Sequence, residues 1–259
     1  MLFILVQFVL RLAFGLALAM IVTPSQLVTS GFFRVHLWVV MGLGTLAALA
    51  ALFGTAGSGV SWMRNPVLLF AIGTAVMSYV GAVVWLYEKP VLGKVFLAVV
   101  TIMALAGALW NMPWPVYTTL PAQILAALDV LTGGLLLGIT MAAMLLGHWY
   151  LNTPTMKLLP LQRLVLLMGV ATLLRAAVSG TGLAWEANAH TLEFSTWLFI
   201  GMRWLSGIVA TALLVVMTWQ TLKIPNTQSA TGILYVGVIC TFLGELTSQL
   251  LSASSSYPL

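Results

Sequence analysis

Apolar residues run in long stretches along the whole chain, separated by short polar or proline-containing segments. At a rise of 1.5 Å per residue, about twenty helical residues cover the ~30 Å hydrocarbon core of a bilayer. A backbone that meets no water there must satisfy its polar groups within a helix. The pattern therefore predicts eight membrane-spanning helices, at residues 2–23, 33–54, 66–87, 91–111, 121–148, 161–181, 193–221 and 231–251.

The segments between these helices are short and contain helix breakers. Asn65-Pro66 and Lys89-Pro90 fall at predicted ends, because proline cannot continue a helix and restricts the residue before it. Residues 1–23 lack a basic start and a cleavage pattern, so we expect a retained first span. The expected fold class is an all-α integral membrane protein, with a tight antiparallel hairpin between the third and fourth helices.

The composition agrees with this class. Apolar residues make up 61% of the 259 residues and charged residues only 6%, with a mean hydropathy of +1.10. A soluble domain carries about a quarter charged residues, so a soluble enzyme is excluded. The single cysteine, Cys240, excludes an intramolecular disulfide and a thiolate metal site. No motif of nucleotide hydrolysis, acyl transfer or metal-assisted proteolysis is present, so we predict no catalytic residue and no metal site.

Basic residues are concentrated in alternate loops. Six lie in or beside the first, third, fifth and seventh loops, whereas the other loops hold only Arg64. Because cytoplasmic loops carry the excess of Lys and Arg, both termini are expected outside the cytoplasm. The expected location of the protein is a bacterial inner membrane. No basic tract suits nucleic acid, so the expected partners are the lipid bilayer and other protein subunits. The six residues are Arg34, Lys89, Lys94, Lys157, Arg163 and Lys223.

Weak internal similarity divides the chain into two halves. Leu37, Met41 and Gly42 align with identical residues 127 positions later. Four helices separate the two copies, and an even number implies parallel repeats about an axis along the membrane normal. Chance identity between apolar segments is the alternative explanation. The pattern suggests two four-helix bundles, formed by residues 1–115 and 116–259.

Charged residues inside predicted helices are the main functional signal. A charged side chain at the bilayer centre costs at least ~2.5–3.5 kcal/mol unless it is paired or hydrated. Two acids and two arginines are expected in the outer half of the membrane, all within the second half of the chain. Either they form a buried ion-pair network, or they build a site for a substrate, an ion or a quinone. The candidate network or binding residues are Asp129, Arg175, Arg203, Glu245, Gln249 and Arg11.

Polar neighbours accompany these charges at three-, four- or seven-residue spacing, which places them on the same helix faces. We expect these faces to point into the bundle. The predicted faces are Thr172, Arg175 and Ser179 in the sixth helix, Thr196, Arg203 and Ser206 in the seventh, and Thr241, Glu245 and Gln249 in the eighth.

Two histidines define a second candidate site. His36 opens the second predicted helix and His148 closes the fifth, so both are expected at the cytoplasmic surface. Facing imidazoles can ligate a haem b iron or hydrogen-bond a quinone carbonyl. The favoured alternative is that each is an interfacial residue beside Trp38 or Trp149.

Short loops and missing catalytic motifs favour a membrane subunit without catalytic activity of its own. The leading hypothesis is a quinone-interacting subunit of a larger redox or membrane complex, whose partners supply the redox centres. One alternative is a transporter of a small solute, ion or proton that uses the intramembrane Asp, Glu and Arg residues. Another is a membrane assembly or scaffold protein in which the charges only pack. The lack of clearly broken helices in matching positions and the concentration of charge in one half count against the transporter.

Overall fold

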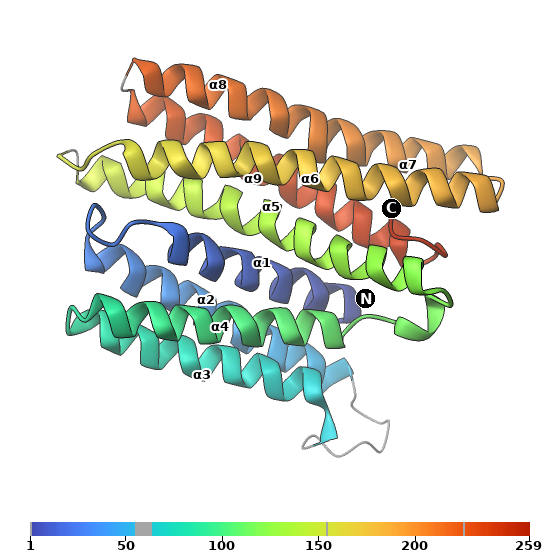
Figure 1. Ribbon diagram of the computed structural model, residues 1–259, viewed down its shortest axis with the longest axis horizontal. Coiled ribbons are helices and arrows are strands. Elements are labelled where there is room, and N and C mark those ends of the chain that lie inside the picture. The colour runs from blue at the N-terminus through green and yellow to red at the C-terminus, as the bar shows by residue number, and fades with distance from the viewer. Residues whose placement is uncertain (1, 55–63, 154, 225) are drawn as a thin grey trace. The chain divides into compact units, whose positions relative to one another are not determined.

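The computed structural model of the protein describes residues 2–54, 64–153, 155–224 and 226–259. Within these residues the chain is helical without any strand, and eight helical rods are long and apolar enough to cross a membrane (Figure 1). The predicted number and type of elements are thus confirmed. The helices are α1 (Leu2–Val22), α2 (Ser30–Gly54), α3 (Pro66–Leu86), α4 (Pro90–Trp110), η2 (Trp114–Val116), α5 (Leu120–Asn152), α6 (Leu159–Ala189), α7 (Phe194–Trp204), η3 (Leu205–Ala210), α8 (Thr211–Lys223) and α9 (Thr227–Ser252).

Side-chain caps and prolines set several helix starts. The Asn65 side chain accepts a hydrogen bond from the Leu68 amide at 3.3 Å, and Pro66 occupies the first turn of α3. Such a cap satisfies one of the amides that the first turn leaves unpaired. Only three residues separate α3 from α4, and Glu88 adopts a left-handed φ of 53° to reverse the chain there. The predicted tight antiparallel hairpin is confirmed.

Helix α6 continues well past its predicted end at residue 181. It runs to Ala189, through the glycines Gly180 and Gly182 that the pattern treats as breakers. An interior glycine costs a helix only ~1 kcal/mol relative to alanine, so tertiary packing overrides it. With 31 residues, α6 exceeds the roughly twenty needed to cross the hydrocarbon core.

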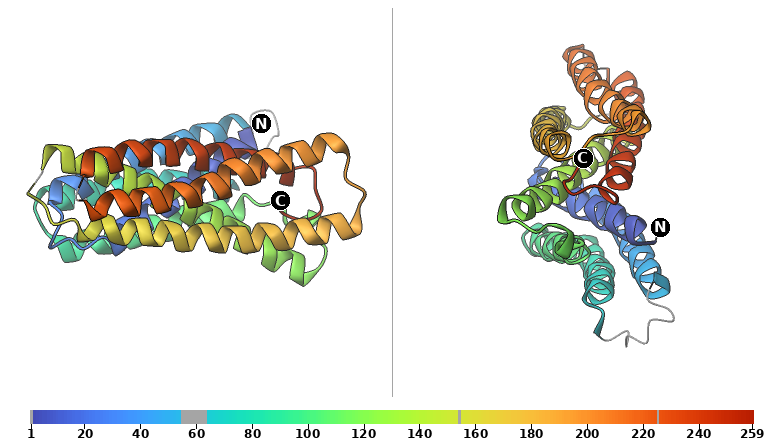
Figure 2. Two further views of the ribbon diagram at one scale, coloured as in Figure 1. Left: turned by 90° about the horizontal axis from the view of Figure 1, so that it is seen from above. Right: turned by 90° about the vertical axis from the view of Figure 1, so that its right-hand side faces the viewer.

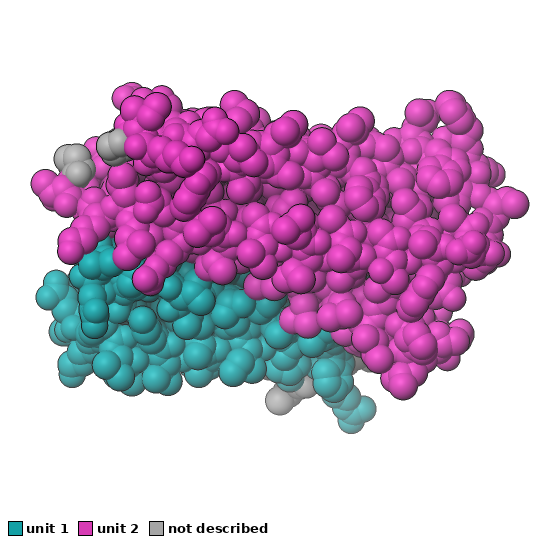
Figure 3. Space-filling view, turned by 45° about the horizontal axis from the view of Figure 1, so that its top comes forward, with its two compact units in different colours: residues 1–112 teal, residues 113–259 magenta. Residues whose placement is uncertain are grey.

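The chain forms two compact units, residues 1–112 and 113–259 (Figure 3). Unit 1 contains α1 to α4, and unit 2 contains α5 to α9 with the short η segments. The predicted halves divide three residues later, and their origin as repeats stays a prediction.

In unit 1, Phe33 stacks on Trp85 with ring centroids 4.2 Å apart. Gly93 leaves room for that indole, since a Cβ there would lie 2.5 Å from it.

The seventh predicted helix is interrupted in the middle. Helices α7 and α8 are joined end to end by η3, a six-residue π-helical segment, and Figure 2 shows the rod from two further sides, with α8 alongside α9. The sequence shows no clearly broken helices in matching positions of the two halves, and its pattern does not indicate this π-helical segment. The widened turn brings Gly207 against Gly244 of α9, where a Cβ on Gly244 would lie 2.3 Å from the Gly207 Cα. Such π turns occur frequently at functional sites.

Candidate functional site

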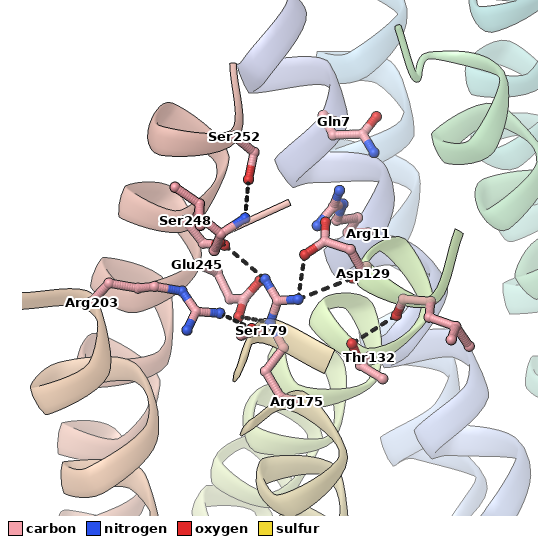
Figure 4. A network of polar contacts seen from close by, with 12 residues as sticks. Gln7, Arg11, Asp129, Thr132, Arg175, Ser179, Arg203, Glu245, Ser248 and Ser252 are labelled. Carbon is pink, nitrogen blue, oxygen red and sulfur yellow. Dashed lines mark hydrogen bonds and ion pairs between the residues drawn. The ribbon is translucent and has the colours of Figure 1, made fainter. Parts of the chain in front are cut away.

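Arg175 holds both carboxylates of the buried centre of unit 2 (Figure 4). Its Nη1 donates to Asp129 Oδ1 at 2.5 Å, while its Nε and Nη2 donate to the two oxygens of Glu245 at 2.6 and 2.9 Å. The parallel pair to Glu245 uses the planar fork of the guanidinium. Nη2 also donates to Ser248 Oγ at 2.9 Å. Arg175 is therefore the hub of an ion-pair network rather than one member of a separate pair.

The network joins three helices at one level. Asp129 lies on α5, Arg175 on α6 and Glu245 on α9. Arg175 is 0% exposed and lies near the middle of the 31-residue α6, roughly 21–24 Å from its ends at 1.5 Å per residue. A pair this deep is weakly screened, and loss of one partner strands the other charge in low dielectric.

Arg203 of α7 has spare hydrogen-bonding capacity beside this network. Its Nη2 donates to Ser179 Oγ of α6, and its guanidinium carbon lies 5.8 Å from the centroid of the Trp204 ring. Within the described part of the chain, its Nε and Nη1 have no hydrogen-bond partner, although the residue is only 1% exposed. Unpaired buried donors are costly, so they call for a ligand or water as acceptor.

Gln249 is another buried side chain of unit 2 with unused polar atoms. It lies one turn beyond Glu245 on α9 and is 6% exposed. Neither its amide nitrogen nor its amide oxygen finds a partner among the residues that the structure describes. We call the buried set in unit 2 the polar core. It consists of Asp129, Arg175, Ser179, Arg203, Glu245, Ser248 and Gln249.

The remaining predicted network residue belongs to the other unit. Arg11 is buried in α1 of unit 1, and its Nη2 lies 3.9 Å from Met112 Sδ. Gln7, one turn earlier, donates to the same sulfur at 3.3 Å. Arg11 and Gln7 thus share a contact with Met112 inside unit 1.

The two candidate histidines also lie in different units. His36 Nδ1 is 2.6 Å from the Phe32 carbonyl oxygen of its own helix, and His148 Nδ1 is 3.3 Å from the Tyr235 hydroxyl. The described residues include no group of three His, Cys, Asp or Glu side chains able to hold a metal ion. Haem or quinone contact at these histidines stays a prediction.

The helix faces were predicted with mixed success. Ser179 joins the polar core, but the Ser206 hydroxyl donates to the Met202 carbonyl of its own helix. Ser206 lies inside η3, where the helical period used for the prediction does not apply. Ser248 was missed, although it is three residues from Glu245, a spacing that places both on one face.

Comparison with protein families, with curated proteins and with solved structures gives no match. The chemistry of unit 2 must therefore be inferred from its own residues. The core contains two arginines and two acids, so its formal charges cancel. The spare capacity lies in guanidinium N–H groups and one amide, which suit an acceptor-bearing ligand.

Proposed function

We propose that the chain is an integral membrane protein, with eight helices across a bacterial inner membrane, that binds a lipid-soluble quinone in unit 2 as a subunit of a larger complex. The observation that supports it is Arg203, whose Nε and Nη1 have no hydrogen-bond partner among the described residues and lie next to an ion-pair network. Quinone carbonyls accept hydrogen bonds and carry no charge. The partner subunits supply the redox centres.

Charge balance favours a neutral ligand over an anion. Arg175 already engages both Asp129 and Glu245, and Arg203 brings the four charges of the core to a sum of zero. An added anion would leave a net negative charge in low dielectric, which is costly. A carbonyl accepts from Arg203 and leaves that balance unchanged.

Removal of the Arg203 donors is expected to weaken quinone binding. Arg203→Gln should raise the Kd of a decyl-benzoquinone by about tenfold or more, since a hydrogen bond to a charged group contributes ~1.5–3 kcal/mol. The Kd is measured by calorimetry on protein in lipid nanodiscs. Arg163→Gln, at an exposed arginine of α6, is the matched control and should leave the Kd unchanged.

Two results would count against the quinone. One is equal affinity in the parent and in the Arg203→Gln variant. The other is decanoate binding that depends on Arg203 in the absence of quinone binding, which would identify an anion site.

The π-helical segment η3 supports a second candidate, a carrier for a small solute. Interrupted helices are common at the binding sites of transporters, and η3 begins two residues after Arg203. The carboxylates argue against a cation as cargo, because Arg175 occupies both Asp129 and Glu245. Solute flux by the isolated protein in liposomes, without partner subunits, would favour the carrier over the quinone subunit.

The proposed orientation predicts the location of two loops. A reporter fused after Leu222 should be cytoplasmic, because the loop that follows carries Lys223, whereas one fused after Pro115 should be extracytoplasmic. Two reporter enzymes, one active only in the cytoplasm and one active only outside it, measure the side of the membrane on which each fusion lies. A reversed result at either position would overturn the orientation, and cytoplasmic activity at both would overturn the insertion of the helices between them.

A further inference from the structure

The segment that follows α9, residues 253–259, folds back onto unit 2 through specific contacts. The Tyr257 amide donates to Glu186 Oε2 of α6 at 2.9 Å, and the Tyr257 ring meets Trp185 edge to face, 5.5 Å between centroids. The Leu259 amide donates to Ser252 Oγ at 2.9 Å. Pro258 and Leu259 are buried although they belong to no helix. The segment is therefore seated on the bundle rather than extended away from it.

One face of α6 connects this seat to the polar core. Arg175, Ser179, Gly182 and Glu186 follow one another at spacings of four, three and four residues, and all four are buried. Such spacing aligns them along one side of the helix. Arg175 and Ser179 hold the charges of the core, whereas Gly182 and Glu186 hold the segment. The segment therefore packs on the part of this helix face that lies beyond the polar core, from Gly182 to Glu186.

Gly182 marks the closest approach. A Cβ on this residue would lie 1.8 Å from the carbonyl oxygen of Pro258, so only glycine permits the observed seat. Ser248 links the segment to the network, because its hydroxyl donates to the Leu259 carbonyl oxygen and accepts from Arg175 Nη2 at 2.9 Å. The seat and the ion-pair network therefore share a side chain.

We infer that residues 253–259 form a displaceable cover that separates the polar core from the aqueous phase at the C-terminal end of α6. The hydrogen bonds and the ring contact described above hold this short segment, which lies outside any helix, and such segments can open locally while the rest of a protein stays folded. The inference rests on the proposed membrane insertion but not on the identity of the ligand. Opening of this cover would expose Ser179 and then Arg203 to water.

The test measures water access to Ser179. Ser179→Cys in a Cys240→Ala background gives one reporter thiol at a position that is buried in the parent. Its modification by a membrane-impermeant methanethiosulfonate is followed over time in nanodiscs. Gly182→Ala should accelerate modification about tenfold or more, because overpacking by one methyl group destabilises the seated segment but not the open one.

Gly180→Ala is the matched control on the same helix. A Cβ there would meet only the Trp204 ring, at 3.6 Å, an ordinary contact, so the modification rate should stay at the parent value. Thr172→Cys, buried on the far side of Arg175, should stay unmodified in every variant, which excludes general unfolding. A chain that ends after Ser256 lacks the seated residues and should label Ser179→Cys fastest.

If the thiol of Ser179→Cys is modified as slowly in the shortened chain as in the full-length chain, the proposed cover is wrong. Equal rates for Gly182→Ala and Gly180→Ala would overturn the role of the Gly182 contact. Because the readout uses no quinone, either failure leaves the proposed quinone binding in place, and a failure of quinone binding leaves the cover in place.

Discussion

Replacement of Arg175 by alanine is expected to destabilise unit 2 by about 3–5 kcal/mol, the usual consequence of stranding a buried charge. The structure makes this residue more critical than a single ion pair, because its guanidinium holds both Asp129 and Glu245. Its loss leaves two carboxylates and the Ser248 hydroxyl without their main donor. The thermal midpoint and the folded yield, measured by fluorescence-detected size exclusion, should both fall.

Neutralisation of one stranded acid should reverse part of the loss. Adding Glu245→Gln to Arg175→Ala is expected to restore part of the midpoint, because the remaining charges of Asp129 and Arg203 again sum to zero and a charge-balanced removal costs less than an unbalanced one. Adding Asp129→Asn as well should lower the midpoint again, since the buried Arg203 then has no acid to balance its charge. Arg163→Gln removes an arginine at an exposed position of the same helix and should leave the midpoint near the parent value.

The same series separates a structural role from a binding role. If the network only orders the bundle, quinone affinity should return together with yield when Glu245→Gln is added to Arg175→Ala. If the network positions Arg203 for the ligand, this double variant should fold and still bind quinone weakly. A parent-like midpoint and yield for Arg175→Ala alone would show that the network does not stabilise unit 2.

A methyl group at Gly244 is expected to separate α9 from η3. Its Cβ would lie 2.3 Å from the Cα and 2.8 Å from the amide nitrogen of Gly207. Both are backbone atoms, which cannot rotate away as a side chain can, so the helices must move. Overpacking of this kind typically costs ~1–3 kcal/mol. Gly244→Ala should therefore lower the thermal midpoint and, by shifting the helix that carries Arg203, weaken quinone binding.

Gly232→Ala provides the control for this change. Gly232 lies on the same helix, and a Cβ there would meet no atom within 4 Å. It should leave the midpoint unchanged or raise it slightly, because alanine is favoured over glycine in a helix by ~1 kcal/mol. If Gly244→Ala behaves like Gly232→Ala, the close packing of α9 on η3 does not contribute to stability.

Much of the architecture could be read from the hydrophobic pattern. The eight helical rods and the α3–α4 hairpin follow from apolar length and proline position, because both act through the local backbone. The composition of the charge cluster was also readable. Asp129, Arg175 and Glu245 are conspicuous in apolar surroundings, and the cost of burying a lone charge implies a partner. Boundaries were less accurate where a glycine such as Gly182 packs against a distant segment.

By itself, the sequence determined the helical class, the number of helices and which charges need partners, since these depend on local period and on the cost of desolvation. Only the tertiary structure decided that Arg175 binds both acids, while Arg203 keeps donors that no described residue pairs. It also decided that η3 interrupts the seventh helix and that residues 253–259 fold back onto Gly182. The reason is that these contacts depend on the rotation and depth of helices far apart in the chain. Side-chain packing sets the rotation and depth of each helix, and no local pattern along the sequence encodes that packing.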